Sequence, residues 1–243
     1  MKLTVLGKHG PWPKAGSACS GYLLEGGGKR LLLDCGCGIL GKLQQHCAIP
    51  ELDGVVLTHL HSDHMGDMMV LRYAMPYFLG IGLTRDPLPV LLPAGPQAVA
   101  ETILNDPGFA ARTVQGGDRM EFLGLDLSFF AVRHPVPCNA VKVQCGGKAL
   151  VYSGDLNTTP GFAGFAAGVD LLLIDGCFPT ADWADDKPHL SARLAAEVGA
   201  EAGAGRVVIT HFRPEDDEAL LLEEARQACP WAELAREGVS YDL

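Results

Sequence analysis

The chain has 243 residues, of which 48% are apolar and 20% are charged. This balance is typical of a folded globular protein and excludes wholesale disorder. The formal net charge of −10 disfavours nucleic acid as a partner, because an acidic chain repels a phosphate backbone unless its basic side chains cluster. The sequence contains no internal repeat, low-complexity segment or linker, so we expect a single domain spanning residues 1–243.

The sequence gives no sign of a membrane span or a signal peptide. No apolar run approaches the roughly 18 residues that a span needs, and only residues 3–6 form an apolar stretch before Gly7. The eight cysteines form no Cys-x-x-Cys pair. In a chain of this length we interpret them as reduced thiols and expect a cytoplasmic protein, with the disulfides of a secreted protein as the alternative.

The pattern of apolar residues predicts alternating strands and helices. In the first half, strands are expected at residues 3–6, 21–24, 30–34, 55–58 and 90–92, and helices at 39–46, 65–79 and 96–104. In the second half, strands are expected at 126–133, 140–144, 149–152, 171–174 and 206–210, and helices at 192–202 and 215–228. Hairpins mixed with strand–helix alternation predict an α/β protein with a four-layer αββα sandwich. Aromatic residues in the apolar helix 65–79, such as Tyr73 and Tyr77, are expected in the core.

Six of the predicted strands lead into a carboxylate or an imidazole. These residues are Asp34, His59, His134, Asp155, Asp175 and His211. Loops at one edge of a sheet are where a rigid scaffold positions reactive groups. We therefore expect these side chains to converge on one site.

The densest polar cluster is His59-Leu60-His61-Ser62-Asp63-His64, between a predicted strand and a predicted helix. Two imidazoles two residues apart on an extended segment point the same way, and Asp63 and His64 can face a second centre. Burying four ionisable groups in six residues without a metal would cost a great deal of free energy. Imidazoles and carboxylates suit zinc, manganese or iron rather than calcium or magnesium. With His134, Asp155 and His211 the cluster gives seven candidate ligands, too many for one tetrahedral ion and suited to two.

Five segments, in this order, resemble the successive motifs of the metallo-β-lactamase fold superfamily. They are Leu33-Asp34-Cys35-Gly36, the Thr58 to His64 run, His134, Tyr152-Ser153-Gly154-Asp155 and Thr210-His211-Phe212. Asp175 followed by Pro188-His189-Leu190-Ser191 also resembles the ribonuclease Z branch. In that branch an acidic residue and a histidine lie between the fourth and fifth motifs.

The resemblance implies a hydrolase with two divalent metal ions, Zn²⁺ in the first place, with Mn²⁺ or Fe as alternatives. It implies that one ion is held by His59, His61 and His134, the other by Asp63, His64 and His211, and that Asp155 bridges them. Asp34 would orient a ligand histidine by a hydrogen bond. The bridging Asp155 argues against β-lactam hydrolysis, because true β-lactamases of this fold generally lack it, whereas phosphodiesterases, lactonases and thioester hydrolases have it.

Our leading hypothesis is therefore a phosphodiesterase acting on a small or cyclic phosphodiester. A hydroxide bridging the two metals would attack phosphorus, and Asp63 would orient it and take its proton. His189, held by Asp175, would protonate the leaving alkoxide. The ribonuclease Z branch has glutamate where this chain has Asp175. Aspartate is one methylene shorter, so we expect its hydrogen bond to His189 to be longer or lost.

Three other functions stay open. A lactone or thioester hydrolase would use the same metals without needing His189 and Asp175. A tRNA 3′-end endonuclease is disfavoured, because tRNA-processing members of the branch carry a protruding arm between the third and fourth motifs, and here His134 and Asp155 are only 21 residues apart. An iron-dependent oxygenase with a single iron would not need Asp63 and His64. We expect a small-molecule substrate, no nucleic-acid or membrane partner, and leave a homodimer open.

Overall fold

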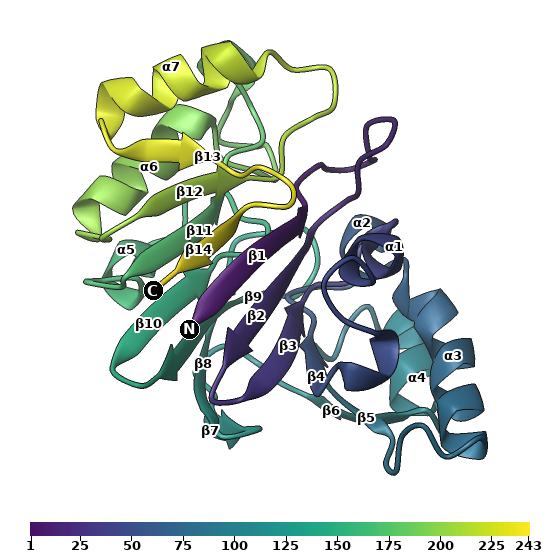
Figure 1. Ribbon diagram of the computed structural model, residues 1–243. Coiled ribbons are helices and arrows are strands. Elements are labelled where there is room, and N and C mark those ends of the chain that lie inside the picture. Colours follow the sequence, from purple (N-terminus) through teal and green to yellow (C-terminus); the bar gives the residue numbers. More distant parts are fainter.

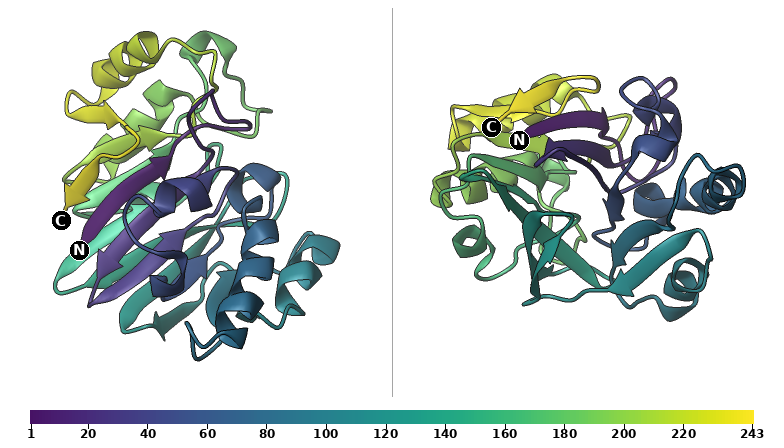
Figure 2. Two further views of the ribbon diagram at one scale, coloured as in Figure 1. Left: turned by 45° about the vertical axis from the view of Figure 1, so that its right-hand side comes forward. Right: turned by 60° about the horizontal axis from the view of Figure 1, so that its bottom comes forward.

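The computed structural model describes residues 1–243 and contains two seven-stranded sheets packed face to face (Figure 1). Helices cover the outer face of each sheet, so the molecule has four layers, which Figure 2 shows from two further directions. The predicted four-layer αββα sandwich is confirmed.

The first sheet comes mainly from the first half of the chain. Its strands are β1 (Lys2–Gly7), β2 (Gly21–Gly26), β3 (Lys29–Leu33), β4 (Gly54–Val56), β5 (Leu88–Leu92), β6 (Phe109–Thr113) and the C-terminal β14 (Ser240–Asp242). Their order across the sheet is β14-β1-β2-β3-β4-β5-β6. The accompanying helices are α1 (Ile39–Leu43), the 3₁₀ helix η1 (Ile49–Glu51), α2 (Ser62–Met65), α3 (Met68–Gly80) and α4 (Gln97–Leu104).

The second sheet comes from the second half. Its strands are β7 (Arg119–Phe122), β8 (Leu125–Val132), β9 (Cys138–Cys145), β10 (Lys148–Tyr152), β11 (Leu171–Asp175), β12 (Val207–Thr210) and β13 (Ala232–Leu234). Their order is β13-β12-β11-β10-β9-β8-β7. The helices are α5 (Phe162–Phe165), the 3₁₀ helix η2 (Thr180–Asp182), α6 (Ala192–Glu201) and α7 (Glu218–Ala228).

The strand directions explain why the polar strand ends meet. Strands β3 to β6 are parallel to one another, and so are β10 to β13. Strand β8 is antiparallel to β9, which is antiparallel to β10, so β8 runs in the same direction as β10. Within each sheet, the strands that lead into candidate site residues therefore have their carboxyl ends at one edge. This edge is the usual place for a site in open α/β sheets.

The core has three parts because each sheet is covered on both faces. The cluster between the sheets includes Tyr22, Leu33 and Leu173. A second cluster lies under α1 to α4, and a third under α5 to α7. Strand β11 is buried along its whole length, which is why it appears in the sequence as a continuous apolar run rather than an alternating one.

The structure corrects three details of the sequence interpretation. The single helix predicted at residues 65–79 is two helices, α2 and α3, and α2 begins early enough to include Asp63 and His64. Strands β6, β7, β13 and β14 and helix α5 were not predicted, because their short, partly exposed segments carry weak patterns. Tyr73 and Tyr77 are exposed, not in the core. No helix combines the length and apolar composition needed to cross a membrane.

Candidate metal centre

The first group of converging side chains consists of His59, His61, His134 and Asp155. One nitrogen or oxygen atom from each lies within 4.8 Å of the others. His59 Nε2 is 3.4 Å from Asp155 Oδ2, and His61 Nδ1 is 3.1 Å from His134 Nε2. These residues follow β4, β8 and β10, so both sheets contribute to the group.

The second group consists of Asp63, His64, His211 and again Asp155, also within 4.8 Å of one another. His64 Nε2 is 3.1 Å from Asp155 Oδ1, and His211 Nε2 is 3.2 Å from Asp63 Oδ2. Asp155 is thus common to both groups. The structure brings together all seven residues in the two sets that the sequence resemblance implies, while their role as metal ligands remains a prediction.

The burial and chemistry of these residues fit a metal centre. His59, His64, His211 and Asp155 are almost completely buried. His64 Nε2 and Asp155 Oδ1 are close but do not meet hydrogen-bond geometry, and neither they nor His59 Nε2 has another hydrogen-bond partner. This is costly for buried polar atoms unless a ligand satisfies them. Imidazole and carboxylate donors in two groups of four suit two transition-metal ions such as Zn²⁺.

The histidines of the two groups differ in the direction in which their pKa values are shifted. Burial lowers the pKa of His59 far below its ordinary value and the pKa of His134 to about 4. At His64 burial acts in the same direction, but the charges of Asp155, Asp34 and Asp63 outweigh it and raise the pKa to about 10. The first group is therefore ready to bind a cation as neutral imidazoles, whereas in the second group a metal must displace protons from the histidines.

Asp34 fixes the orientation of His64 from beneath the site. The Asp34 carboxylate accepts hydrogen bonds from Thr58 N at 2.7 Å and from the Tyr152 hydroxyl at 2.7 Å, and its Oδ2 is 2.8 Å from His64 Nδ1. This contact holds Nε2 of His64 toward Asp155. Asp34 and His211 also have positive φ angles of 59° and 67°, a conformation found at only one other non-glycine residue, Leu123. The backbone is strained where it turns side chains into the centre.

His189 and Asp175 lie beside the second group. The carboxylate of Asp175 is fully buried, its Oδ2 is 2.8 Å from His189 Nδ1, and it also accepts from the Leu156 and Cys177 backbone N–H groups. The expectation that this hydrogen bond is longer or lost is wrong. A β-bridge between Phe178 and Ser191 holds the segment that contains His189 near the end of β11. The His189 ring stacks on that of His211 at 4.8 Å.

Sequence reasoning missed two features of the centre. Cys177 is buried and forms a cluster with His189 and His211, but an isolated cysteine gives no pattern to detect. Gly10 packs directly on the His211 ring, and a Cβ there would overlap Nε2 and Cε1 of the imidazole. Its backbone N–H donates to Phe212 O at 3.0 Å, which holds the N-terminal loop against the residue after His211. These two segments lie about 200 residues apart in the sequence, so no local signal announces the contact.

Comparisons with known proteins agree with this fold. A family model described as "Beta-lactamase superfamily domain" matches residues 29–212. The "Probable metallo-hydrolase YhfI" of Bacillus subtilis (strain 168) is 32% identical over 218 residues, which cover 87% of each chain. The crystal structure of the B. subtilis YhfI protein, a metallo-beta-lactamase fold protein by its title, matches with a TM-score of 0.94 and 27% identity over 99% of this chain and 98% of that one.

Two further similarities are more distant. A "Ribonuclease Z" of Methanopyrus kandleri is 27% identical over 279 residues, covering 98% of this chain and 96% of the relative. A diphosphatase from the PhnP family has a similar fold, with a TM-score of 0.79 and 18% identity over 99% of this chain and 96% of that one.

We predict two divalent transition-metal ions per chain. Asp155→Ala should lose both ions because Asp155 belongs to both groups, whereas His61→Ala should weaken mainly the first. Elemental analysis of protein purified with and without added metal measures this, and His46→Ala, which removes an exposed histidine, is the control. One ion per chain in excess metal, unchanged by Asp63→Ala, would rule out the dinuclear centre.

We predict that Gly10→Ala disturbs the second group. The added methyl overlaps the His211 ring, so the ring or the loop must move, at a cost of about 1–3 kcal/mol in the free energy of unfolding. Metal content should fall toward one ion per chain. The control is Gly41→Ala in α1, where a Cβ meets nothing within 4 Å and a helical alanine should stabilise by roughly 0.5–1 kcal/mol. Equal metal content in both variants would contradict the prediction.

Proposed function

This chain belongs to the β-lactamase superfamily, whose domain model matches residues 29–212, and on that premise we propose that it is a metal-dependent hydrolase of a small or cyclic phosphodiester. The observation that carries the proposal is the position of the His189–Asp175 pair beside two buried His/Asp groups that share Asp155. In this arrangement the proposed proton donor lies next to the proposed two-metal centre.

The proposed ligands are those of the two groups, with Zn²⁺ as the first candidate metal and Mn²⁺ or Fe as alternatives. His59, His61 and His134 would hold one ion, Asp63, His64 and His211 the other, and Asp155 both. When bound, two such ions activate a water molecule and stabilise charge on the oxygens of a phosphodiester.

Asp63 is proposed to orient the attacking water and to accept its proton. Burial raises the pKa of Asp63, but the neighbouring imidazoles of His64 and His211 outweigh this and hold the pKa below its ordinary value. The carboxylate is therefore ionised at neutral pH and can accept a hydrogen bond from the attacking water. It retains slight exposure at the entrance to the centre, where a water molecule can reach it.

His189 is proposed to protonate the leaving group. Its Nδ1 is engaged by Asp175, which leaves Nε2 as the nitrogen that can donate to a substrate oxygen. The buried carboxylate of Asp175 stabilises the protonated imidazole, as a general acid requires. The His189 side chain is partly exposed, so substrate can reach it. A lactone or thioester hydrolase would not need this pair, which makes His189 the residue that separates the two hypotheses.

A cavity of about 400 Å³ that includes His134 in its wall has the size for a small substrate. Its wall includes Pro93, Val114, Gln115 and Asn139 and contains no lysine or arginine. Cavities that bind small molecules are mostly apolar with a few polar groups. This cavity offers no cation to a phosphate, whereas a second cavity of about 280 Å³ that also includes His134 is lined by Arg133 and Lys187.

The ribonuclease Z relative makes a tRNA endonuclease the second candidate. Against it, residues between His134 and Asp155 form only β9, the Gly146-Gly147 turn and β10, with no inserted arm, and the net charge is −10. We therefore propose a small-molecule substrate and neither a nucleic-acid nor a membrane partner. We also propose a cytoplasmic location, because all eight cysteines are free thiols.

We predict that His189→Ala slows an alkyl or cyclic diester by about 10²- to 10⁴-fold, because an alkoxide is a poor leaving group without a proton. Hydrolysis of bis(p-nitrophenyl) phosphate should fall much less, because p-nitrophenolate leaves readily. Metal content should not change, because His189 is not a proposed ligand. Asp175→Asn should give a milder loss of the same kind.

The comparison needs the two diesters, a lactone and a thioester assayed in parallel with metal content. If His189→Ala slows both diesters equally, or neither, His189 is not the acid. If the wild-type protein hydrolyses the lactone or thioester faster than the diesters, and His189→Ala does not slow that reaction, the acyl-hydrolase alternative replaces the proposal. Membership of the superfamily alone would then be no argument for phosphodiesterase activity.

We predict no more than weak tRNA binding at physiological salt. The acidic chain and the missing arm both disfavour it. A gel-shift titration at several salt concentrations measures binding. Sub-micromolar affinity with a steep salt dependence would instead identify a basic patch, for which Arg112, Arg119 and Lys142, on strands β6, β7 and β9, are the residues to substitute.

A further inference from the structure

A third cavity lies in the helix layer that covers the outer face of the second sheet. It has a volume of about 290 Å³ and lies between helix α6 and the segment that runs from the end of β10 into α5. Helices α5 and α6 are in contact with each other, and Figure 1 shows both on the same side of the second sheet. None of the proposed metal ligands, nor Asp175 or His189, lines this cavity. We refer to it as the α5–α6 cavity.

Much of the wall of the α5–α6 cavity is apolar. Leu194 and Val198 are four residues apart and so lie on one side of α6, and Leu156, Phe162 and Leu190 also line the cavity. Leu194 and Val198 are only partly buried against the core beneath them. A ligand in the cavity would therefore remove more of their apolar surface from water, which is favourable.

The charged part of the wall is entirely acidic. Glu197 and Glu201 line the cavity one helical turn apart, and no lysine or arginine does. Glu197 is paired with Arg193 at 3.1 Å, where both side chains are exposed, whereas Glu201 has no such partner. Glu201 is also the last residue of α6, whose last turn contains no basic residue. Because the C-terminal end of a helix carries a partial negative charge, this end of the cavity favours a cation.

We propose that the α5–α6 cavity binds a small amine with an apolar body. The apolar body lies against Leu194 and Val198, and the ammonium group lies at Glu197 and Glu201. The volume is close to the lower end of the range for small-molecule cavities, about 300–1,000 Å³, which suits a small molecule rather than a peptide helix about 10 Å in diameter. An anionic ligand would be repelled by the two carboxylates. This binding goes beyond the proposed hydrolysis and does not depend on it.

The α5–α6 cavity adjoins the His189–Asp175 pair without containing it. Leu156 and Leu190, which line the cavity, directly follow Asp155 and His189 in the sequence. The backbone N–H of Leu156 donates to Asp175 Oδ2 at 3.0 Å, the same oxygen that is 2.8 Å from His189 Nδ1. A ligand in the cavity should therefore change the environment of the Leu156 and Leu190 amides.

Nuclear magnetic resonance titration of the metal-loaded, isotopically labelled protein tests the proposal. The probe is 2-phenylethylamine, with 2-phenylethanol and 3-phenylpropionate as its neutral and anionic counterparts. The amine should bind about tenfold more tightly than the alcohol, because it gains interactions with two carboxylates and a helix end. The anion should not bind. The amides of Leu156 and Leu190 should shift on binding, whereas those of Gln115 and Gly116, in the cavity of about 400 Å³ that includes His134, should not.

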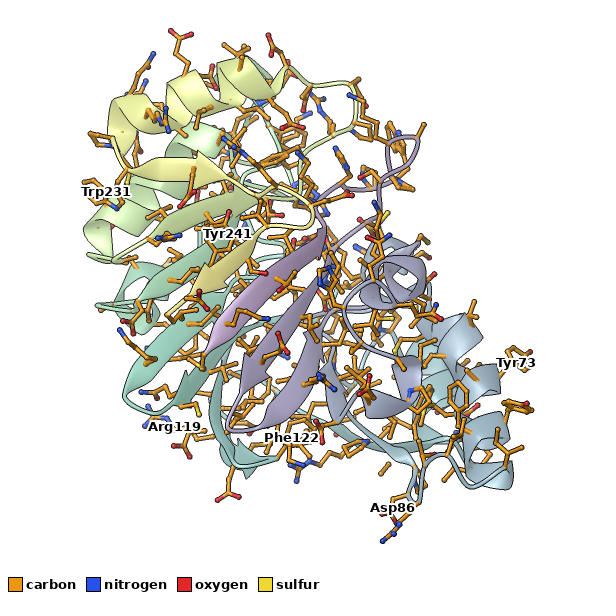
Figure 3. All side chains as sticks on the ribbon, viewed as in Figure 1. Tyr73, Asp86, Arg119, Phe122, Trp231 and Tyr241 are labelled. Carbon is orange, nitrogen blue, oxygen red and sulfur yellow. The ribbon has the colours of Figure 1, made fainter.

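Four variants locate the binding. Glu201→Gln should reduce the preference for the amine over the alcohol about threefold, whereas Glu223→Gln, which changes an exposed glutamate on α7 that does not line the cavity, should not. Val198→Phe should fill the cavity and abolish binding of both compounds, without changing the circular dichroism spectrum. Trp231→Ala removes a half-exposed aromatic ring at the surface (Figure 3) and should leave binding unchanged.

Four results would each overturn the proposal. They are equal binding of the amine and the anion, shifts confined to Gln115 and Gly116, an unchanged preference in Glu201→Gln, and no saturation up to about 10 mM amine, well above a millimolar Kd. Because the titration involves no hydrolysis, these results leave the proposed phosphodiesterase to be judged by its own assays.

Discussion

The burial of Asp155 is the constraint around which the centre is built. This carboxylate lies in the interior with imidazole nitrogens on several sides, at 3.1 Å from His64, 3.4 Å from His59 and 3.4 Å from His211. A buried charge is tolerated only when paired or when it binds a cation. Asp155 can be buried after the end of β10 only because the histidines that follow β4, β8 and β12 lie around it. The directions of the strands are therefore linked to the electrostatics of the centre, because they bring the imidazoles to the buried Asp155 carboxylate.

The strain at Asp34 and His211 follows from the same requirement. Each residue turns the chain sharply at the end of a buried strand, in a backbone conformation that costs a non-glycine residue free energy. At Asp34 the cost is offset by hydrogen bonds from Thr58 and Tyr152 and by the contact with His64. At His211 the adjacent backbone is paired with the loop that contains Gly10. The surrounding contacts thus stabilise both backbone conformations.

The sequence predicted the sandwich and the convergence of the site residues because both depend on local signals: continuous apolar strands, and polar residues placed where those strands end. The division of the seven residues into two sets came from the resemblance to the superfamily. It did not predict features that depend on distant contacts. The break between α2 and α3 is invisible in an apolar pattern. The approach of Gly10 to His211 joins opposite ends of the chain. The contact of Asp175 with His189 accompanies a β-bridge between Phe178 and Ser191 that no local pattern indicates. Tyr73 and Tyr77 were misplaced because the apolar composition of α3 does not show which of its sides faces solvent.

The distribution of the site along the chain also bears on how the protein is made. His59 and His61 leave the ribosome long before His211, and β12, which positions His211, pairs only with β11 and β13 near the end of synthesis. Contacts between such distant residues form late in folding, because closing long loops is entropically costly. A nascent chain that ends before residue 211 can offer the first histidines to a cation but cannot enclose it. Tight binding of the proposed second ion should therefore follow completion of the fold rather than precede it.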